Sequence, residues 1–131
     1  MEKEFIPYQQ ALDLRELGFD EPCFTFYQKE YHEDAPIMVF DKDEYRLTGF
    51  RTCKNSEIPY HYTAAPLYQQ AFKWFRKNKI HSSVSEFDIN NYMYYIDDGI
   101  NRDIEVPGYD TYEEAELACL INLIEIVKEK K

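Results

Sequence analysis

The sequence predicts a single α+β domain over residues 1–131, with antiparallel strands and three helices in the order α-β-β-β-α-β-β-α. The length of 131 residues is typical of one domain. Three segments carry apolar residues at helical spacing, and runs of aromatic and β-branched residues lie between them. The last helical segment is apolar on nearly every side, so we expect this C-terminal helix to be central to the core.

The first helix is expected to begin at Pro7, because the missing N–H of proline costs nothing in the first helical turn. Gly18 can adopt the left-handed conformation that ends a helix, and Phe19 can then fold back on the last turn in a Schellman motif. The apolar stripe between these ends consists of Tyr8, Ala11, Leu12, Leu14 and Leu17.

Strands are expected next along the chain. Cys23–Tyr27 and Ile37–Phe40 are apolar runs bounded by proline or polar residues. Asp41–Glu44 is typical of a turn, which would join the second run to Tyr45–Arg51 in a hairpin. A further short strand is expected at Tyr60–Thr63.

The second helix is expected from about Ala64 to Lys77, with Thr63 as its cap and Pro66 in its first turn. A second set of strands follows, at Val84–Ile89 and Tyr92–Ile96, joined by a turn at Asn90–Asn91. Asp103–Val106 is compatible with a short final strand.

The third helix has the clearest start signal. Thr111 and Glu114 have the spacing of a capping box, in which Thr111 accepts a hydrogen bond from the Glu114 backbone. The polar residues that interrupt the apolar surface of the helix are Glu116, Asn122, Glu125 and Glu129.

The charge balance disfavours nucleic acid and anionic membranes as partners. The chain has 15 basic and 25 acidic residues, a net charge of −10, whereas phosphate binding requires clustered lysine and arginine. The longest purely apolar run, Leu117–Ile121, is far shorter than a membrane span, and the first residues do not resemble a signal peptide. Three widely spaced cysteines, Cys23, Cys53 and Cys119, are expected to be buried thiols, and a cytoplasmic location is predicted.

The sequence predicts no cofactor, no metal site and no catalytic residue. Its glycines at 18, 49, 99 and 108 form no phosphate-binding motif. The histidines, at 32, 61 and 81, do not have the spacing of a metal site. His61 lies between two tyrosines and is the place where a pocket of a small enzyme or of a small-molecule binder would be sought first.

Tyrosine is unusually frequent, with 12 residues. Tyr60 and Tyr62 share one strand face, and Tyr92 and Tyr94 share another, because side chains alternate along a strand. These four tyrosines form a candidate interaction surface if their faces are exposed, since tyrosine is enriched in protein interfaces. The alternative is that a helix half-covers each face and the hydroxyl groups reach water.

Three segments carry a resemblance to a known group of proteins: Leu17–Phe24, Ala65–Arg76 and Thr111–Leu120. In this order they are similar to a family of small uncharacterised proteins of bacteriophages and prophages of gut bacteria. The resemblance implies a phage setting in a host-cell cytoplasm, and it implies no activity and no functional residues.

Two functions therefore remain open. The first is a non-enzymatic interaction protein that binds a protein partner, a host or phage factor, through an acidic, tyrosine-rich surface. The second is a small enzyme or small-molecule-binding domain with a pocket near His61.

Overall fold

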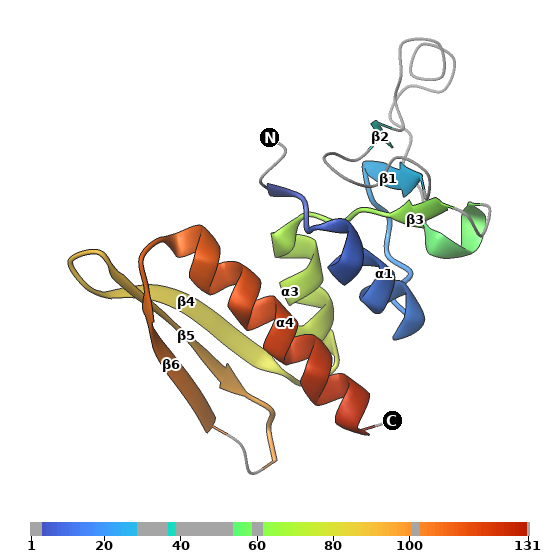
Figure 1. Ribbon diagram of the computed structural model, residues 1–131. Coiled ribbons are helices and arrows are strands. Elements are labelled where there is room, and N and C mark those ends of the chain that lie inside the picture. The colour runs from blue at the N-terminus through green and yellow to red at the C-terminus, as the bar shows by residue number, and fades with distance from the viewer. Residues whose placement is uncertain (1–3, 29–36, 39–53, 59–61, 101–102, 131) are drawn as a thin grey trace. The chain divides into compact units, whose positions relative to one another are not determined.

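A computed structural model describes residues 4–28, 37–38, 54–58, 62–100 and 103–130. These residues have the α+β class that the sequence predicts, with three α-helices and two antiparallel sheets in the predicted order, and the second set of strands has a third member, β6 (Figure 1). They group into two compact units, Met1–Gln70 and Ala71–Lys131. The organisation as a single domain stays a prediction.

The first helix of the first unit, α1, spans Tyr8–Glu16. Pro7 is its N-cap, with an extended backbone. At the other end Gly18 has a φ of 102°, and the Phe19 N–H donates to the Leu14 carbonyl at 2.9 Å. The expected Schellman motif is thus confirmed, and it turns the Phe19 side chain into the interior.

The sheet of the first unit has the strand order β2-β1-β3. Its strands are β1 (Thr25–Gln28), β2 (Ile37–Met38) and β3 (Tyr62–Ala64). The central strand β1 pairs antiparallel with both neighbours. The expected turn at Asp41–Glu44 and the expected strand at Tyr45–Arg51 lie outside the described residues.

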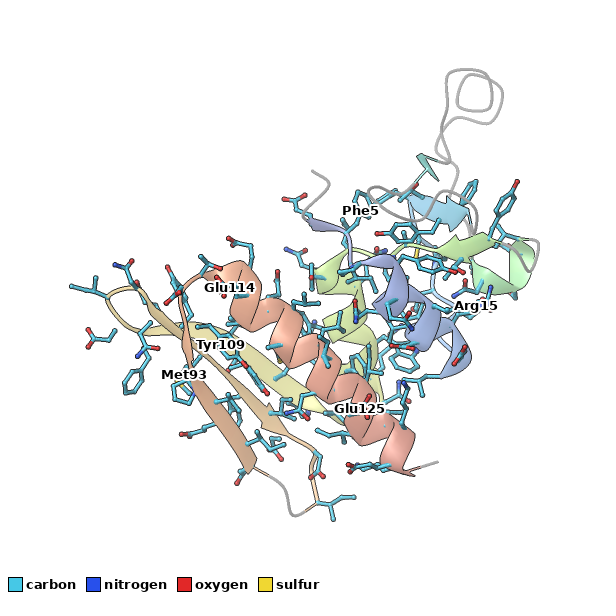
Figure 2. The ribbon with its side chains drawn as sticks, viewed as in Figure 1. Phe5, Arg15, Met93, Tyr109, Glu114 and Glu125 are labelled. Atoms are coloured by element: carbon cyan, nitrogen blue, oxygen red, sulfur yellow. The ribbon has the colours of Figure 1, made fainter. Side chains whose placement is uncertain are left out.

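Side chains of α1 and of the short 3-10 helix η3 (Asn55–Glu57) fix the position of β3. Arg15, labelled in Figure 2, donates from Nη1 to the Tyr62 carbonyl at 3.1 Å and to Thr63 Oγ1 at 3.3 Å. Asn55 accepts from the Ala64 N–H and donates to the Phe19 carbonyl, both at 2.9 Å. Because these bonds satisfy backbone groups at the end of a short strand, they replace the ladder that a longer sheet would supply.

The second helix begins later than the sequence predicts. It is α3, which spans Tyr68–Lys77, begins at the end of the first unit and continues in the second. Thr63 is part of β3 and does not cap the helix, and the Leu67 N–H instead donates to Gln70 Oε1 at 2.8 Å. The expectation for Thr63 is wrong because β3 and the residues after it remain extended up to the helix.

The second unit contains an antiparallel meander of three strands. They are β4 (His81–Asp88), β5 (Asn91–Asp97) and β6 (Asp103–Tyr109), in the order β4-β5-β6. The turn between β4 and β5 is at Ile89–Asn90, where Asn90 has a φ of 57°, one residue earlier than expected. The strand expected at Asp103–Val106 is present and is longer.

The last helix, α4, spans Tyr112–Lys130 and lies across one face of this sheet (Figure 1). Thr111 caps it, because the Glu114 N–H donates to Thr111 Oγ1 at 3.1 Å, as expected. The buried residues of α4 are Ala115, Cys119, Leu120, Leu123, Ile124 and Ile126. The helix therefore supplies much of the core of the second unit.

Candidate functional site

Two of the residues that the sequence singles out, Tyr60 and His61, lie outside the described residues. Tyr62, on β3, is half-buried, and its ring centroid lies 4.7 Å from that of Phe26 on β1. This tilted aromatic pair spans two neighbouring strands and stabilises the small sheet of the first unit. Part of the Tyr62 ring is therefore in contact with Phe26 and is not exposed to solvent.

The face that carries Tyr92 and Tyr94 is covered by α4. Tyr94 is only 4% exposed, and its hydroxyl accepts a hydrogen bond from Asn122 Nδ2 at 2.9 Å. Tyr92 is half-buried, and its ring packs edge-on against that of Tyr112, with 6.4 Å between centroids. Tyr94 is therefore not part of an exposed contact surface, and that expectation is corrected. Its side chain packs beneath α4, in agreement with the alternative in which a helix covers this face of the sheet.

The opposite face of the same sheet is open in the described residues. Strand register places its side chains in rows across the three strands. We call this set the open face: His81, Ser83 and Ser85 of β4, Met93, Tyr95 and Asp97 of β5, and Asp103 and Glu105 of β6. Met93, labelled on the sheet in Figure 2, lies beside Tyr95 in the middle strand.

Tyr95 lies among three carboxylates on the open face. Its hydroxyl donates to Asp103 Oδ1 at 2.9 Å, and Glu105 is its register partner on β6. The hydrogen bond to Asp103 raises the pKa of Tyr95 above its usual value, and slight desolvation and the charges of Asp103, Asp97 and Glu105 raise that pKa further. The hydroxyl is thus a neutral donor surrounded by negative charge.

Asp97 and Asp103 stand directly opposite each other on β5 and β6. Like charges in a directly opposed pair destabilise a sheet, because their Cβ atoms are only ~5 Å apart. Within the described part of the chain, no lysine or arginine forms an ion pair with Asp97, Asp103 or Glu105. A cationic group brought to this face would relieve the repulsion.

The sequence alone does not reveal the open face. Period-two alternation shows that Tyr92 and Tyr94 share a face and that Tyr95 lies on the other face, but it does not show which face the helix covers. The carboxylates that follow on β6, Asp103 and Glu105, have the same parity as Tyr95 in the observed register. That pattern becomes informative only when the pairing of β5 with β6 is known.

The described cysteines are structural. Cys23 and Cys119 are both buried, as expected, and Cys53 lies outside the described residues. Burial raises the pKa of the Cys119 thiol to about 12, while a hydrogen bond with Ser82 lowers it to a smaller extent. Cys119 is therefore a protonated, unreactive thiol at neutral pH.

No group of three or more histidine, cysteine and acidic side chains in the described residues is arranged to hold a metal ion. None of the helices within the described ranges has the length and apolar character that crossing a bilayer requires. No family model, curated protein or solved structure matches this chain.

Proposed function

We propose that this protein is a non-enzymatic interaction protein that binds a basic protein partner through the open face of the β4–β5–β6 sheet. The observation that carries the proposal is the position of Tyr95, a rigid aromatic side chain in the middle of a sheet face, hydrogen-bonded to one carboxylate and close to two others. Aromatic anchors surrounded by polar groups are typical of protein interfaces.

The charge of the chain supports a basic partner. Its net charge of −10 attracts cationic proteins and speeds their encounter, and it repels nucleic acid and anionic membrane surfaces. On the open face itself, the opposed Asp97 and Asp103 gain most from an incoming arginine, because a guanidinium can donate to a carboxylate with two parallel hydrogen bonds.

The biological setting that we propose rests on the resemblance to small phage and prophage proteins. In that setting the protein acts in the cytoplasm of the host cell, and the partner is a host or phage factor. The second function that the sequence leaves open, a small enzyme or small-molecule binder with a pocket near His61, is not favoured by any observation on the described residues.

The proposal is tested by capture of proteins from host lysate on the immobilised chain. The informative variant replaces Asp97→Asn, Asp103→Asn and Glu105→Gln together, which removes three charges and keeps side-chain size. Wild type is expected to retain a partner with a basic surface, and the variant is expected to lose it by roughly tenfold or more, since each charged contact at an interface contributes about 1 kcal/mol or more.

A matched control separates the open face from total charge. The control variant also removes three negative charges, but from exposed helical positions outside the sheet: Glu16→Gln, Glu125→Gln and Glu129→Gln. Equal loss of the partner in both triple variants, or retention of the partner in both, would reject the open face as the binding surface.

A further inference from the structure

The two outer strands of the β4–β5–β6 sheet differ in how their edges are protected. The β6 edge contains Pro107, which has no N–H to donate, and Gly108, with a φ of 101°. The register between β5 and β6 shifts at this point, opposite Tyr92–Tyr94. Proline and register irregularities are devices by which proteins prevent a further strand from pairing, so the β6 edge is blocked at its C-terminal end and only Asp103–Val106 keep unbroken register with β5.

The β4 edge lacks these devices over most of its length. Its eight residues include no proline, glycine, lysine or arginine. His81–Ser85 pair with β5 in unbroken register, and an irregularity appears only beyond Glu86. In the described residues the backbone hydrogen bonds of β4 go to β5 and to no other segment.

An edge strand of this kind can pair with a further β-strand. In an antiparallel sheet, every second residue of an outer strand points its N–H and C=O groups away from its partner. Over His81–Ser85 these groups form a regular ladder that one more strand can complete.

We propose that an extended segment of the partner adds to β4 as a fourth strand, and that this segment alternates basic and apolar residues. The inference deepens the proposed function and rests on it, because the basic character of the partner comes from there. Strand addition would supply main-chain hydrogen bonds, and the two faces of the sheet would select the side chains.

On the open face, β4 presents short side chains next to the edge. Ser83 and Ser85 are exposed, and Tyr95 and Asp97 lie on the next strand. Because neighbouring strands are only ~4.8 Å apart, an arginine on the added strand can extend over the serines towards the Tyr95 ring and the Asp97 carboxylate.

On the other face, β4 lies beside α4 (Figure 1). Ser82 and Val84 are half-buried on that face. Apolar side chains of an added strand would extend this partly buried surface. Since successive residues of a strand point to opposite faces, the two requirements together predict alternation of basic and apolar residues.

A second copy of this chain is a poor occupant of the same edge. Each copy carries a net charge of −10, and Glu86 and Asp88 lie at the C-terminal end of β4. Pairing two β4 strands would bring these carboxylates and those of both open faces together, which opposes association. Charge complementarity therefore favours a basic segment.

The test uses two blocked synthetic peptides as long as β4 and equal in charge. One alternates arginine with valine, and the other alternates arginine with proline, which cannot complete a β ladder. Calorimetric titration of the full chain is expected to give a dissociation constant roughly tenfold lower for the arginine–valine peptide. Amide exchange by NMR is expected to slow at the outward-pointing N–H groups within His81–Ser85 when that peptide binds.

Edge variants make the test specific to β4. Ser85→Pro and Ser83→Lys are each expected to weaken binding of the arginine–valine peptide about tenfold. Gln69→Lys, on the exposed surface of α3, makes the same charge change as Ser83→Lys and is expected to leave the affinity unchanged. If Ser85→Pro fails to fold, which its amide spectrum would reveal, Ser83→Lys and its control decide the outcome.

The two proposals fail in different ways. Equal affinity for both peptides, with unchanged exchange at β4, overturns strand addition, and the capture experiment then still decides the proposed function. If the arginine–valine peptide pairs with β4 but the open-face variant captures the same partner as wild type, the open-face function is overturned and strand addition stands.

Discussion

Asn122 and Tyr94 form the most informative side-chain pair in the second unit. Asn122 donates to the Tyr94 hydroxyl at 2.9 Å, and the ring centroid of Tyr109 lies 6.0 Å from that of Tyr94. Tyr94 therefore joins β5 to α4 through a hydrogen bond and to β6 through a ring contact. The hydrogen bond stabilises the second unit because each partner satisfies a polar group that would otherwise be partly buried and unpaired.

We expect Asn122→Ala and Tyr94→Phe each to lower the free energy of unfolding by about 1 kcal/mol, since each leaves its partner without a bond. The double variant should lose less than the sum, with a coupling energy of about 0.5–1 kcal/mol. Urea unfolding of the four proteins measures this cycle. Strictly additive losses would show that the hydrogen bond contributes nothing of its own.

Tyr27 gives the first unit a dependence on alkaline pH. Its hydroxyl donates to the Ile6 carbonyl at 2.7 Å, and burial raises its pKa from 10.0 to about 12. When the pKa of a group is higher in the folded protein than in the unfolded chain, its contribution to stability is fully present below the pKa of the unfolded chain. That contribution is lost as the pH rises through the pKa of the folded protein. Tyr27 should therefore stabilise the protein up to about pH 10 and cease to do so towards pH 12.

The variant Tyr27→Phe isolates this contribution from that of Cys119, whose pKa burial also raises to about 12. Near neutral pH we expect wild type to be more stable than the variant by about 1 kcal/mol, because the variant loses the bond to Ile6. That difference should shrink between pH 10 and 12. A difference in unfolding free energy that stays constant over this range would contradict the assigned pKa.

The helix α4 shows how burial divides one element into two kinds of position. Leu123 is fully buried, whereas Ile121, less than one turn away, is 42% exposed. We expect Leu123→Ala to cost about 2–5 kcal/mol of unfolding free energy, because it removes buried methyl groups and leaves a cavity. Ile121→Ala should change stability by less than about 1 kcal/mol, and equal effects in denaturant unfolding would contradict the placement of α4 on the sheet.

Local sequence predicts an element well where one residue type is required by the backbone. Gly18 and Thr111 are correctly assigned because a left-handed helix end and an N-terminal cap each need a particular kind of side chain. The end of α3 has the same Schellman geometry, with Lys79 at a φ of 70° and the Ile80 N–H bonded to the Phe75 carbonyl. Lysine carries no signal for that conformation, so the sequence alone does not reveal this motif.

Features that depend on long-range pairing are the ones that the sequence does not predict. Thr63 has the residue type of a cap, yet pairing with β1 makes it part of a strand. Tyr94 and Tyr95 are the same residue type in adjacent positions, and only the packing of α4 decides which one is buried. The fold class is therefore predicted correctly from the sequence, while the surface that we propose for binding comes from the register of β4, β5 and β6.

Net charge links the stability of the whole chain to its proposed binding. A chain with a charge of −10 repels itself when folded, and the opposed carboxylates Asp97 and Asp103 add a local repulsion. Carboxylates that favour a cationic partner thus lower the stability of the free protein, a trade-off that is common at binding surfaces. Salt screens both effects: it raises the stability of the free protein by weakening the repulsion, and it lowers the affinity for a cationic partner by weakening the attraction.

We expect the melting temperature to rise by roughly 2–5 °C between about 0.01 and 0.15 M sodium chloride, because the screening length falls from ~30 to ~8 Å. Over the same range the affinity for the partner, or for the arginine–valine peptide, should fall. The variant Asp97→Asn, Asp103→Asn, Glu105→Gln should melt higher than wild type at low salt and respond less to salt. Parallel rather than opposed salt responses of melting temperature and affinity would show that the open-face carboxylates are not the charges on which both depend.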